Sequence, residues 1–172
     1  MGWFARLLGA TPKEKPRGIR LDTSRPFCEL DGKTDSPHLL RALGDLLPEG
    51  CILYFEGGSS AKALVDFFHA HEVPEQSHVA VAVLRPRLSC HHVPATLDNL
   101  SGLSELAKSH RAPELAVHLH VYRNAEILLE WHDAFWEPML LSGTLPEKKV
   151  RTFAETLGMT IRRGPSGAPS SS

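Results

Sequence analysis

The first candidate for chemistry is a run of small residues, Gly57, Gly58, Ser59 and Ser60, between an apolar stretch and an amphipathic one. A helix N-terminus offers unpaired backbone amides and positive partial charge, and glycines let an anion approach the main chain. This glycine-serine corner is therefore a candidate site for a phosphate or a carboxylate. The simpler interpretation is a turn in which a serine side chain caps the following helix.

The corner matches no known fingerprint for phosphate binding or nucleophilic catalysis. Neither G-x-x-x-x-G-K-S/T nor G-x-G-x-x-G occurs in the chain. The pattern Gly57-x-Ser59-x-Ala61 has an alanine where a nucleophile elbow carries its second glycine. The motif alone therefore does not assign a reaction.

A second polar segment, RPRLSCHH over residues 85–92, follows the next apolar run. Arg85 and Arg87 can hold an anion by charge-assisted hydrogen bonds, and Cys90 with His91 places a thiol beside a base. If both segments follow parallel strands, they lie at the same edge of the sheet. We therefore predict a ligand-binding rim made of the glycine-serine corner, Arg85 and Arg87. The alternative is that the arginines pair with Glu56 or other surface carboxylates and that the histidines lie in a solvated loop.

A third cluster, His118, Glu130 and His132, contains residue types that bind zinc. It lies on one face of a predicted hairpin, where cross-strand histidine and glutamate are also ordinary neighbours. The sequence shows no closed set of four ligands, so we expect no structural metal and no cofactor.

That hairpin is predicted from two runs of alternating apolar and polar residues between Glu114 and Asp133. A two-residue loop would pair Leu119 with Glu130, so we expect a three-residue loop, Arg123–Ala125, which matches apolar with apolar residues. In this register His118 lies opposite Glu130. The residues expected in the core are Val117, Leu119, Leu129 and Trp131, followed by Phe135 and Trp136.

The remaining periodicities predict an α/β fold with a single mixed sheet. Strand 51–55, helix 60–71 and strand 78–84 form a parallel βαβ unit, which the antiparallel hairpin follows. Helices pack on the sheet. The other helices expected are 36–47, capped by Ser36, 97–109, and one that begins with a capping box at Thr144 and ends at Gly158.

Length and charge limit the classes of protein. The 172 residues, 42% of them hydrophobic, suffice for one substantial core. We expect a short amphipathic segment and linker over residues 1–18, one α/β domain over 19–162 and a disordered tail over 163–172. The net charge of −1 gives no global attraction to nucleic acid, and no apolar run is long enough to span a membrane.

The cysteine spacing bears on the cellular location, and the N-terminal segment bears on partners. Cys28, Cys51 and Cys90 form no C-x-x-C pair, so we expect reduced thiols and a cytoplasmic location. The N-terminal segment has an apolar helical face that could contact its own domain, a protein partner or a membrane interface. This face consists of Trp3, Phe4, Leu7 and Leu8.

The sequence thus predicts a non-catalytic domain that binds a protein partner or a small anionic ligand. The alternative is a small hydrolase or transferase that uses the rim formed by Gly57–Ser60 and Arg85–His92.

Overall fold

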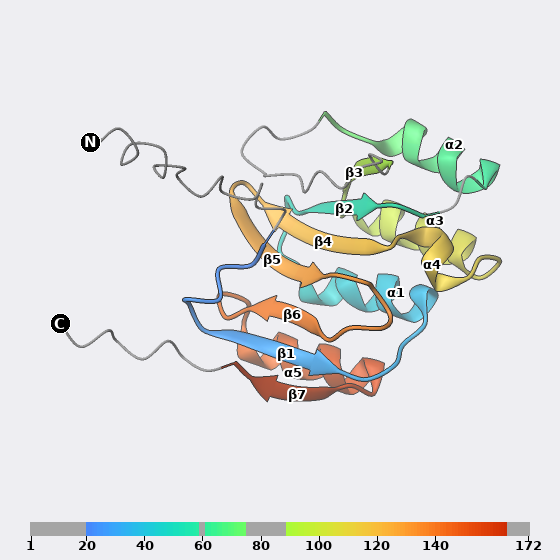
Figure 1. The fold of residues 1–172 in the computed structure, drawn as a ribbon. Coiled ribbons are helices and arrows are strands. Elements are labelled where there is room, and N and C mark those ends of the chain that lie inside the picture. Colours follow the sequence, from blue (N-terminus) through green and yellow to red (C-terminus); the bar gives the residue numbers. More distant parts are fainter. Residues whose placement is uncertain (1–19, 59–60, 75–88, 165–172) are drawn as a thin grey trace, which may run out of the picture.

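The computed structural model describes residues 20–58, 61–74 and 89–164, which form one antiparallel sheet with helices packed against it (Figure 1). The strand order is β3-β2-β4-β5-β6-β1-β7. The strands are β1 (Phe27–Asp31), β2 (Ile52–Glu56), β3 (Cys90–Pro94), β4 (His118–Arg123), β5 (Glu126–Trp131), β6 (Met139–Ser142) and β7 (Thr160–Arg163). The helices are α1 (Ser36–Leu46), α2 (Lys62–His71), α3 (Leu97–Ala107), α4 (Ala112–Leu115) and α5 (Glu147–Leu157).

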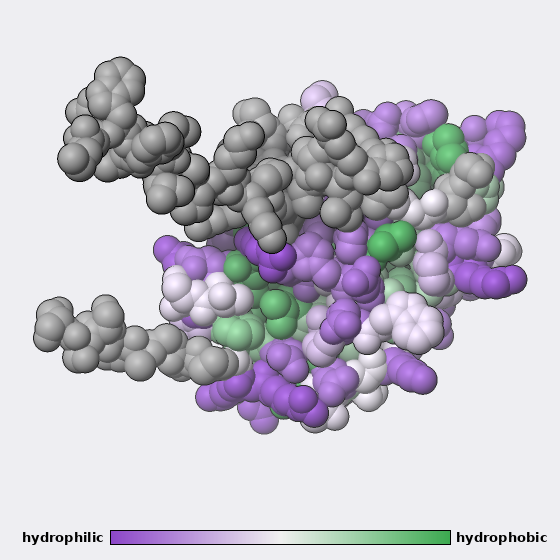
Figure 2. All heavy atoms as spheres, in the orientation of Figure 1, coloured by the Kyte–Doolittle hydropathy of each residue, from purple (hydrophilic) through white to green (hydrophobic). Residues whose placement is uncertain are grey.

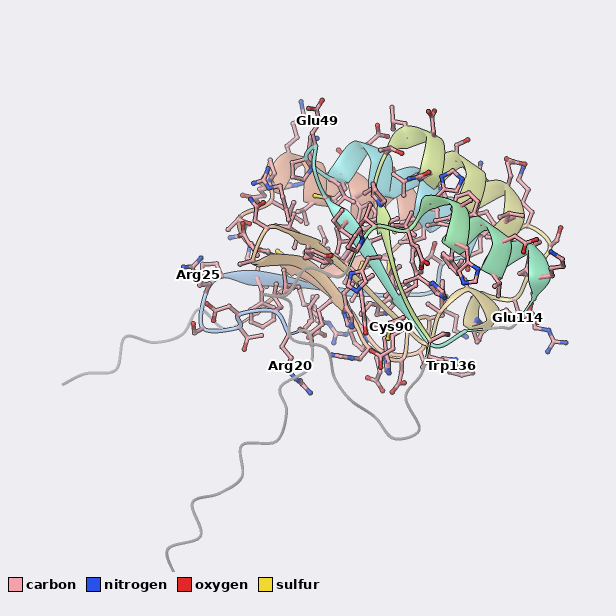
Figure 3. All side chains as sticks on the ribbon, turned by 90° about the horizontal axis from the view of Figure 1, so that it is seen from above. Arg20, Arg25, Glu49, Cys90, Glu114 and Trp136 are labelled. Carbon is pink, nitrogen blue, oxygen red and sulfur yellow. The ribbon has the colours of Figure 1, made fainter. Side chains whose placement is uncertain are left out.

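Four helices form a layer on one face of the sheet. In this layer α1 packs between α3 and α5, and α2 packs beside α3 (Figure 3). The main core lies between the layer and the sheet, where alternate strand residues such as Leu53, Phe55 and Val121 are buried. The opposite face has no helix layer among the described residues. Since side chains alternate along a strand, the residues between these core positions point to that opposite face.

The predicted α/β class, with helices packed on a single sheet, is confirmed. A parallel βαβ pairing is not among the described pairings, because both edges of β2 are occupied by antiparallel neighbours, β3 and β4. The strand expected over 78–84 lies outside the described residues, as does the N-terminal segment over 1–18. At the C-terminal end β7 runs to Arg163, one residue beyond the predicted end of the domain.

The start of α1 differs from the prediction. Asp35, not Ser36, is the N-cap, and its carboxylate accepts the backbone N–H of His38 at 2.7 Å. Asp35 takes this role because its backbone is extended, whereas Ser36 has already entered the helix. The Ser36 hydroxyl is consequently buried without a hydrogen-bond partner in the described structure.

The start of α5 also differs from the prediction. Its N-cap is Pro146, which makes no side-chain cap hydrogen bond. Thr144, which was predicted to open a capping box, instead donates its hydroxyl to the Glu126 carboxylate at 2.8 Å. The predicted end of this helix is confirmed, since Gly158 occupies the C-cap with a left-handed φ of 66°.

In the hairpin of β4 and β5, apolar residues pair with apolar residues, as predicted, but the loop and the register differ from those expected. Its loop has two residues, since Arg123 pairs with Glu126, and a β-bulge then shifts the register between Val121 and Tyr122. Leu119 consequently lies opposite Trp131, and Glu130 lies opposite His120. The predicted three-residue loop and the pairing of His118 with Glu130 were therefore wrong. Leu119, Leu129 and Trp131 are buried as expected, whereas Val117 is half-buried.

No helix in the described ranges is both long and apolar enough to cross a membrane.

Candidate functional site

The predicted rim is only partly within the described residues, because Ser59, Ser60, Arg85 and Arg87 lie outside them. At Gly57, φ is 75° and the backbone N–H donates to the Ser89 carbonyl at 2.9 Å. At Gly58, φ is 105°, and an added Cβ would lie 2.9 Å from the Leu115 carbonyl oxygen. A positive φ at both glycines, together with close packing at Gly58, thus accounts for them without a ligand.

The serine cap expected at this corner is wrong. The N-cap of α2 is Ala61, which makes no side-chain cap hydrogen bond. The Ala61 carbonyl accepts the backbone N–H groups of Leu64 and Val65, so the helix starts after both serines. Residues 90–92, expected in a loop, begin β3 instead.

Titratable side chains gather on the sheet face opposite the helices. On this side the structure places aromatic and polar residues in mutual contact. We call this set the histidine face: Tyr54, Glu56, His92, His118, His120, Tyr122, Glu130 and His132. Cys90 borders it, and Figure 3 shows Cys90 and Trp136 on the side of the sheet away from the helices.

Much of the histidine face is buried. Glu56 is 3% exposed and His120 is 1% exposed, and Glu130 is also buried. Burying a polar or charged group costs free energy unless hydrogen bonds and opposite charges compensate for the lost water. The partners of these groups therefore decide what the face can do.

Two histidines are held by backbone amides. The Nδ1 atom of His118 accepts the N–H of Asp133 at 3.0 Å, and the Nδ1 atom of His120 accepts the N–H of Trp131 at 3.3 Å. A nitrogen that accepts a proton from an amide carries none itself, so a neutral ring bears its proton on Nε2. His118 and His120 are thus fixed as Nε2–H donors.

Both rings favour the neutral form. Burial lowers the pKa of His118, and the neighbouring His132 lowers it further. The same two causes, again with burial first, hold the pKa of His120 well below its ordinary value. The ring centroid of His132 lies 4.7 Å from that of His120 and 5.1 Å from that of His118, so a charge on one ring disfavours a charge on the others.

The proposed zinc ligands do not converge. Glu130 lies opposite His120, and its Oε1 atom is 3.0 Å from Nε2 of His132. The lone pair of His118 at Nδ1 is already used by an amide, and its Nε2 carries the proton. Within the described ranges, no group of three histidine, cysteine or acidic side chains is arranged to hold a metal ion.

Glu56 is a buried carboxylate with little compensation. The Tyr54 hydroxyl lies 3.0 Å from its Oε2 atom and 3.2 Å from Cys90 Sγ. Burial first, and then the Cys90 hydrogen bond, raise the pKa of Tyr54, so its hydroxyl keeps its proton. That proton goes to the carboxylate, since a charged acceptor forms the stronger hydrogen bond.

No lysine or arginine of the described residues forms an ion pair with Glu56. Their ion pairs go to other carboxylates, namely Asp22, Glu29, Asp31, Asp66, Glu105 and Glu147. Glu130 is better satisfied, because its Oε2 atom accepts the backbone N–H of Leu21 and His132 lies beside Oε1. The two buried carboxylates of the face therefore differ in how well they are compensated.

The loop after β5 ends beside the histidine face. Asp133 and Phe135 have left-handed φ angles of 42° and 76°, which residues other than glycine rarely adopt. Trp136, expected in the core, is 84% exposed. The indole of Trp131 is buried and donates to the Glu137 carbonyl at 2.6 Å, so the core position is already filled.

The sequence did not lead us to predict Tyr54, Glu56 or His120 as site residues, and it led us to predict His92 only as part of the rim at residues 85–92. Alternation along the strand was the available signal, because Tyr54 and Glu56 interrupt the apolar run of β2 at every second position. His92 was read as part of a loop, although it occupies the same face of β3 as Cys90.

No protein-family model matches the chain, and no curated protein or solved structure was found to be similar to it. The fold and the geometry of the histidine face are therefore the basis for assigning a function.

Proposed function

We propose that this domain binds a small polar ligand on the histidine face. The observation that carries the proposal is the buried carboxylate of Glu56 near His118 and His120, which favour the neutral form, on the sheet face where the described residues place no helix layer. Apolar side chains would cover this face at a lower desolvation cost, as they do on the opposite face. Groups that break the rules of a stable core are typical of functional sites.

A cluster of side chains with shifted pKa values supports a ligand site. Tyr54, His118 and His120 all have shifted pKa values, each with burial as the first cause, and they lie on adjacent strands. Such clusters are common where ligands bind or reactions occur, although structural networks also produce them.

A protein-docking surface receives less support. The large exposed apolar side chains of the described residues are Leu97 on α3, Trp136 in a loop and Ile161 on β7, which belong to separate elements. In Figure 2, which views the side away from the helices, the visible hydrophobic residues of the described part form small separate areas among hydrophilic ones. A protein interface usually offers a larger continuous apolar patch.

The proposal is tested by thermal unfolding with a panel of small amines, carboxylates, phosphates and sugars. A ligand that binds the native state raises the unfolding temperature. The parent is compared with His118→Asn, because the asparagine oxygen can still accept the Asp133 amide while the Nε2–H donor is lost. His71→Asn is the control, since His71 is an exposed residue of α2 that stacks on Phe67.

We expect at least one compound to stabilise the parent and the control, and to stabilise His118→Asn less. The proposal fails if no compound raises the unfolding temperature more than a salt of the same ionic strength does. It also fails if all three proteins respond equally.

A further inference from the structure

We infer that the ligand carries a positive charge, as an organic ammonium or guanidinium group, and that the Glu56 carboxylate binds it. This inference rests on the proposed function, and it concerns the chemical class of the ligand at the same site. It differs in sign from the anion expected at the glycine-serine corner.

The described charges on the histidine face are mainly negative. Glu56 and Glu130 are both buried there, and the charges of Glu56 and Asp133 act on His118. Of the described basic side chains, Arg20 acts on His120. An anion at His118 would meet two carboxylates, whereas a cation would relieve their repulsion.

Glu56 is the anchor because no described lysine or arginine forms an ion pair with it. It pairs across the sheet with Cys90 of β3 and with His118 of β4, so both neighbouring strands hold its position. Its described hydrogen bond is the one from Tyr54. A buried carboxylate gains most from a partner that brings both charge and hydrogen-bond donors, and an ammonium group supplies both.

Aromatic rings hold Tyr54 and its hydroxyl in place beside Glu56. The Tyr54 ring stacks on His120, with centroids 5.7 Å apart, and is tilted against His92 at 5.0 Å. Packing on both sides fixes this ring beside the carboxylate.

A transition-metal cation fits the site poorly, because metals need free lone pairs. The Nδ1 lone pairs of His118 and His120 are used by backbone amides. An ammonium or guanidinium group needs acceptors instead, and Glu56 provides them. His118 keeps its Nε2–H donor for a hydroxyl or carbonyl oxygen elsewhere on the ligand.

The test uses three probes that share a butyl chain and differ in charge: butylammonium, pentanoate and pentanol. Binding is measured at constant ionic strength by ligand-observed NMR titration of the full chain. The variants are Glu56→Gln, which keeps an acceptor for Tyr54 but removes the charge, and Glu49→Gln as the control. Figure 3 shows Glu49 on the helix side of the molecule, away from Cys90.

We expect butylammonium to bind the parent and Glu49→Gln, and to bind Glu56→Gln at least about tenfold more weakly, as loss of a charge-assisted contact requires. Thermal unfolding confirms that Glu56→Gln is folded. Tyr54→Phe is the second variant. It removes the hydroxyl that competes for Glu56, so its affinity for butylammonium should equal or exceed that of the parent.

Other results overturn the inference. If pentanoate binds and Glu56→Gln strengthens it, the ligand is an anion; if pentanol binds equally to all variants, charge is not recognised. In both cases the proposed function stands. Absence of butylammonium binding overturns the inference, and it overturns the proposed function too only if the whole panel also fails.

Discussion

At the scale of single residues, His120 connects the histidine face to the stability of the fold. Its Nδ1 atom accepts the Trp131 amide, and its ring stacks on Tyr54. Protonation at Nδ1 would remove the acceptor and place a charge in a buried position near His118 and His132. The His120 ring therefore stabilises the sheet only while it is neutral.

We predict that His120 makes the protein less stable in mild acid. Because the folded pKa lies below the unfolded value of about 6.5, the unfolded state binds the proton first. The stability that neutral His120 provides is therefore fully present above the unfolded pKa, and it is lost as the pH falls toward the folded pKa. If the ring stays neutral in the folded protein over this range, the free energy of unfolding falls by about 1.4 kcal/mol between pH 8 and pH 5.5.

The measurement is urea unfolding of the parent and His120→Asn at both pH values. The variant should be less stable at pH 8 but should lose less on acidification. His71→Asn, whose histidine is exposed, should keep the pH dependence of the parent. Equal losses in the parent and His120→Asn would show that His120 is not the group that titrates.

At the scale of elements, the hairpin shows what an alternating pattern determines. A three-residue loop, and a two-residue loop followed by a β-bulge, both place Leu119 opposite an apolar residue. Alternation therefore predicted which residues face the core, but not the register. The difference of two residues moved Glu130 from His118 to His120, and the composition of the histidine face changed with it.

Helix starts were less predictable for a related reason. Asp35 and Ser36 are both good capping residues, and the sequence does not show which of them leaves the extended conformation first. At α2, tertiary contacts of the preceding glycines set the path of the chain, and the helix begins without a side-chain cap.

We predict that packing, rather than the approach of a ligand, requires glycine at position 58, so Gly58→Ala should strongly destabilise the ligand-free protein. The added methyl group would meet the Leu115 carbonyl, and φ is positive. Gly50→Ala is the matched control, because Gly50 also has a positive φ but no atom within 4 Å of the added group. We expect Gly50→Ala to cost about 1 kcal/mol and Gly58→Ala at least about 2 kcal/mol in urea unfolding. If both substitutions lower the free energy of unfolding by the same amount, packing does not require glycine at position 58.

At the scale of the whole molecule, the sequence predicted the class and the single sheet, but not the strand order. Hydrophobic periodicity is local, whereas β1 lies between β6 and β7, which come from the far end of the chain. The site was hard to predict for the same reason. Cys90 and His92 become neighbours of Tyr54 only when β3 pairs with β2, and the sequence does not show which face the helices leave uncovered.

The strand order also predicts how the described fold unfolds. The first described strand, β1, pairs with the last, β7, and one continuous core extends from Cys51 beside β2 to Met159 before β7. Neither half of the sheet can keep its core covered without the other, so we expect a single cooperative transition. The Cys51 thiol is buried, and burial raises its pKa, which protects it from reagents in the native state.

Two probes therefore test cooperativity at different places in the sheet. Urea unfolding is followed by Trp131 fluorescence, which reports on β5 once Trp3 and Trp136 are replaced by phenylalanine. It is also followed by thiol labelling of Cys51, with Cys28 and Cys90 replaced by serine to make the labelling specific. The two transitions should coincide, because loss of β2 would expose the same core that buries Trp131. Labelling of Cys51 at a clearly lower urea concentration than the fluorescence change would show instead that β2 and β3 unfold as a separate unit.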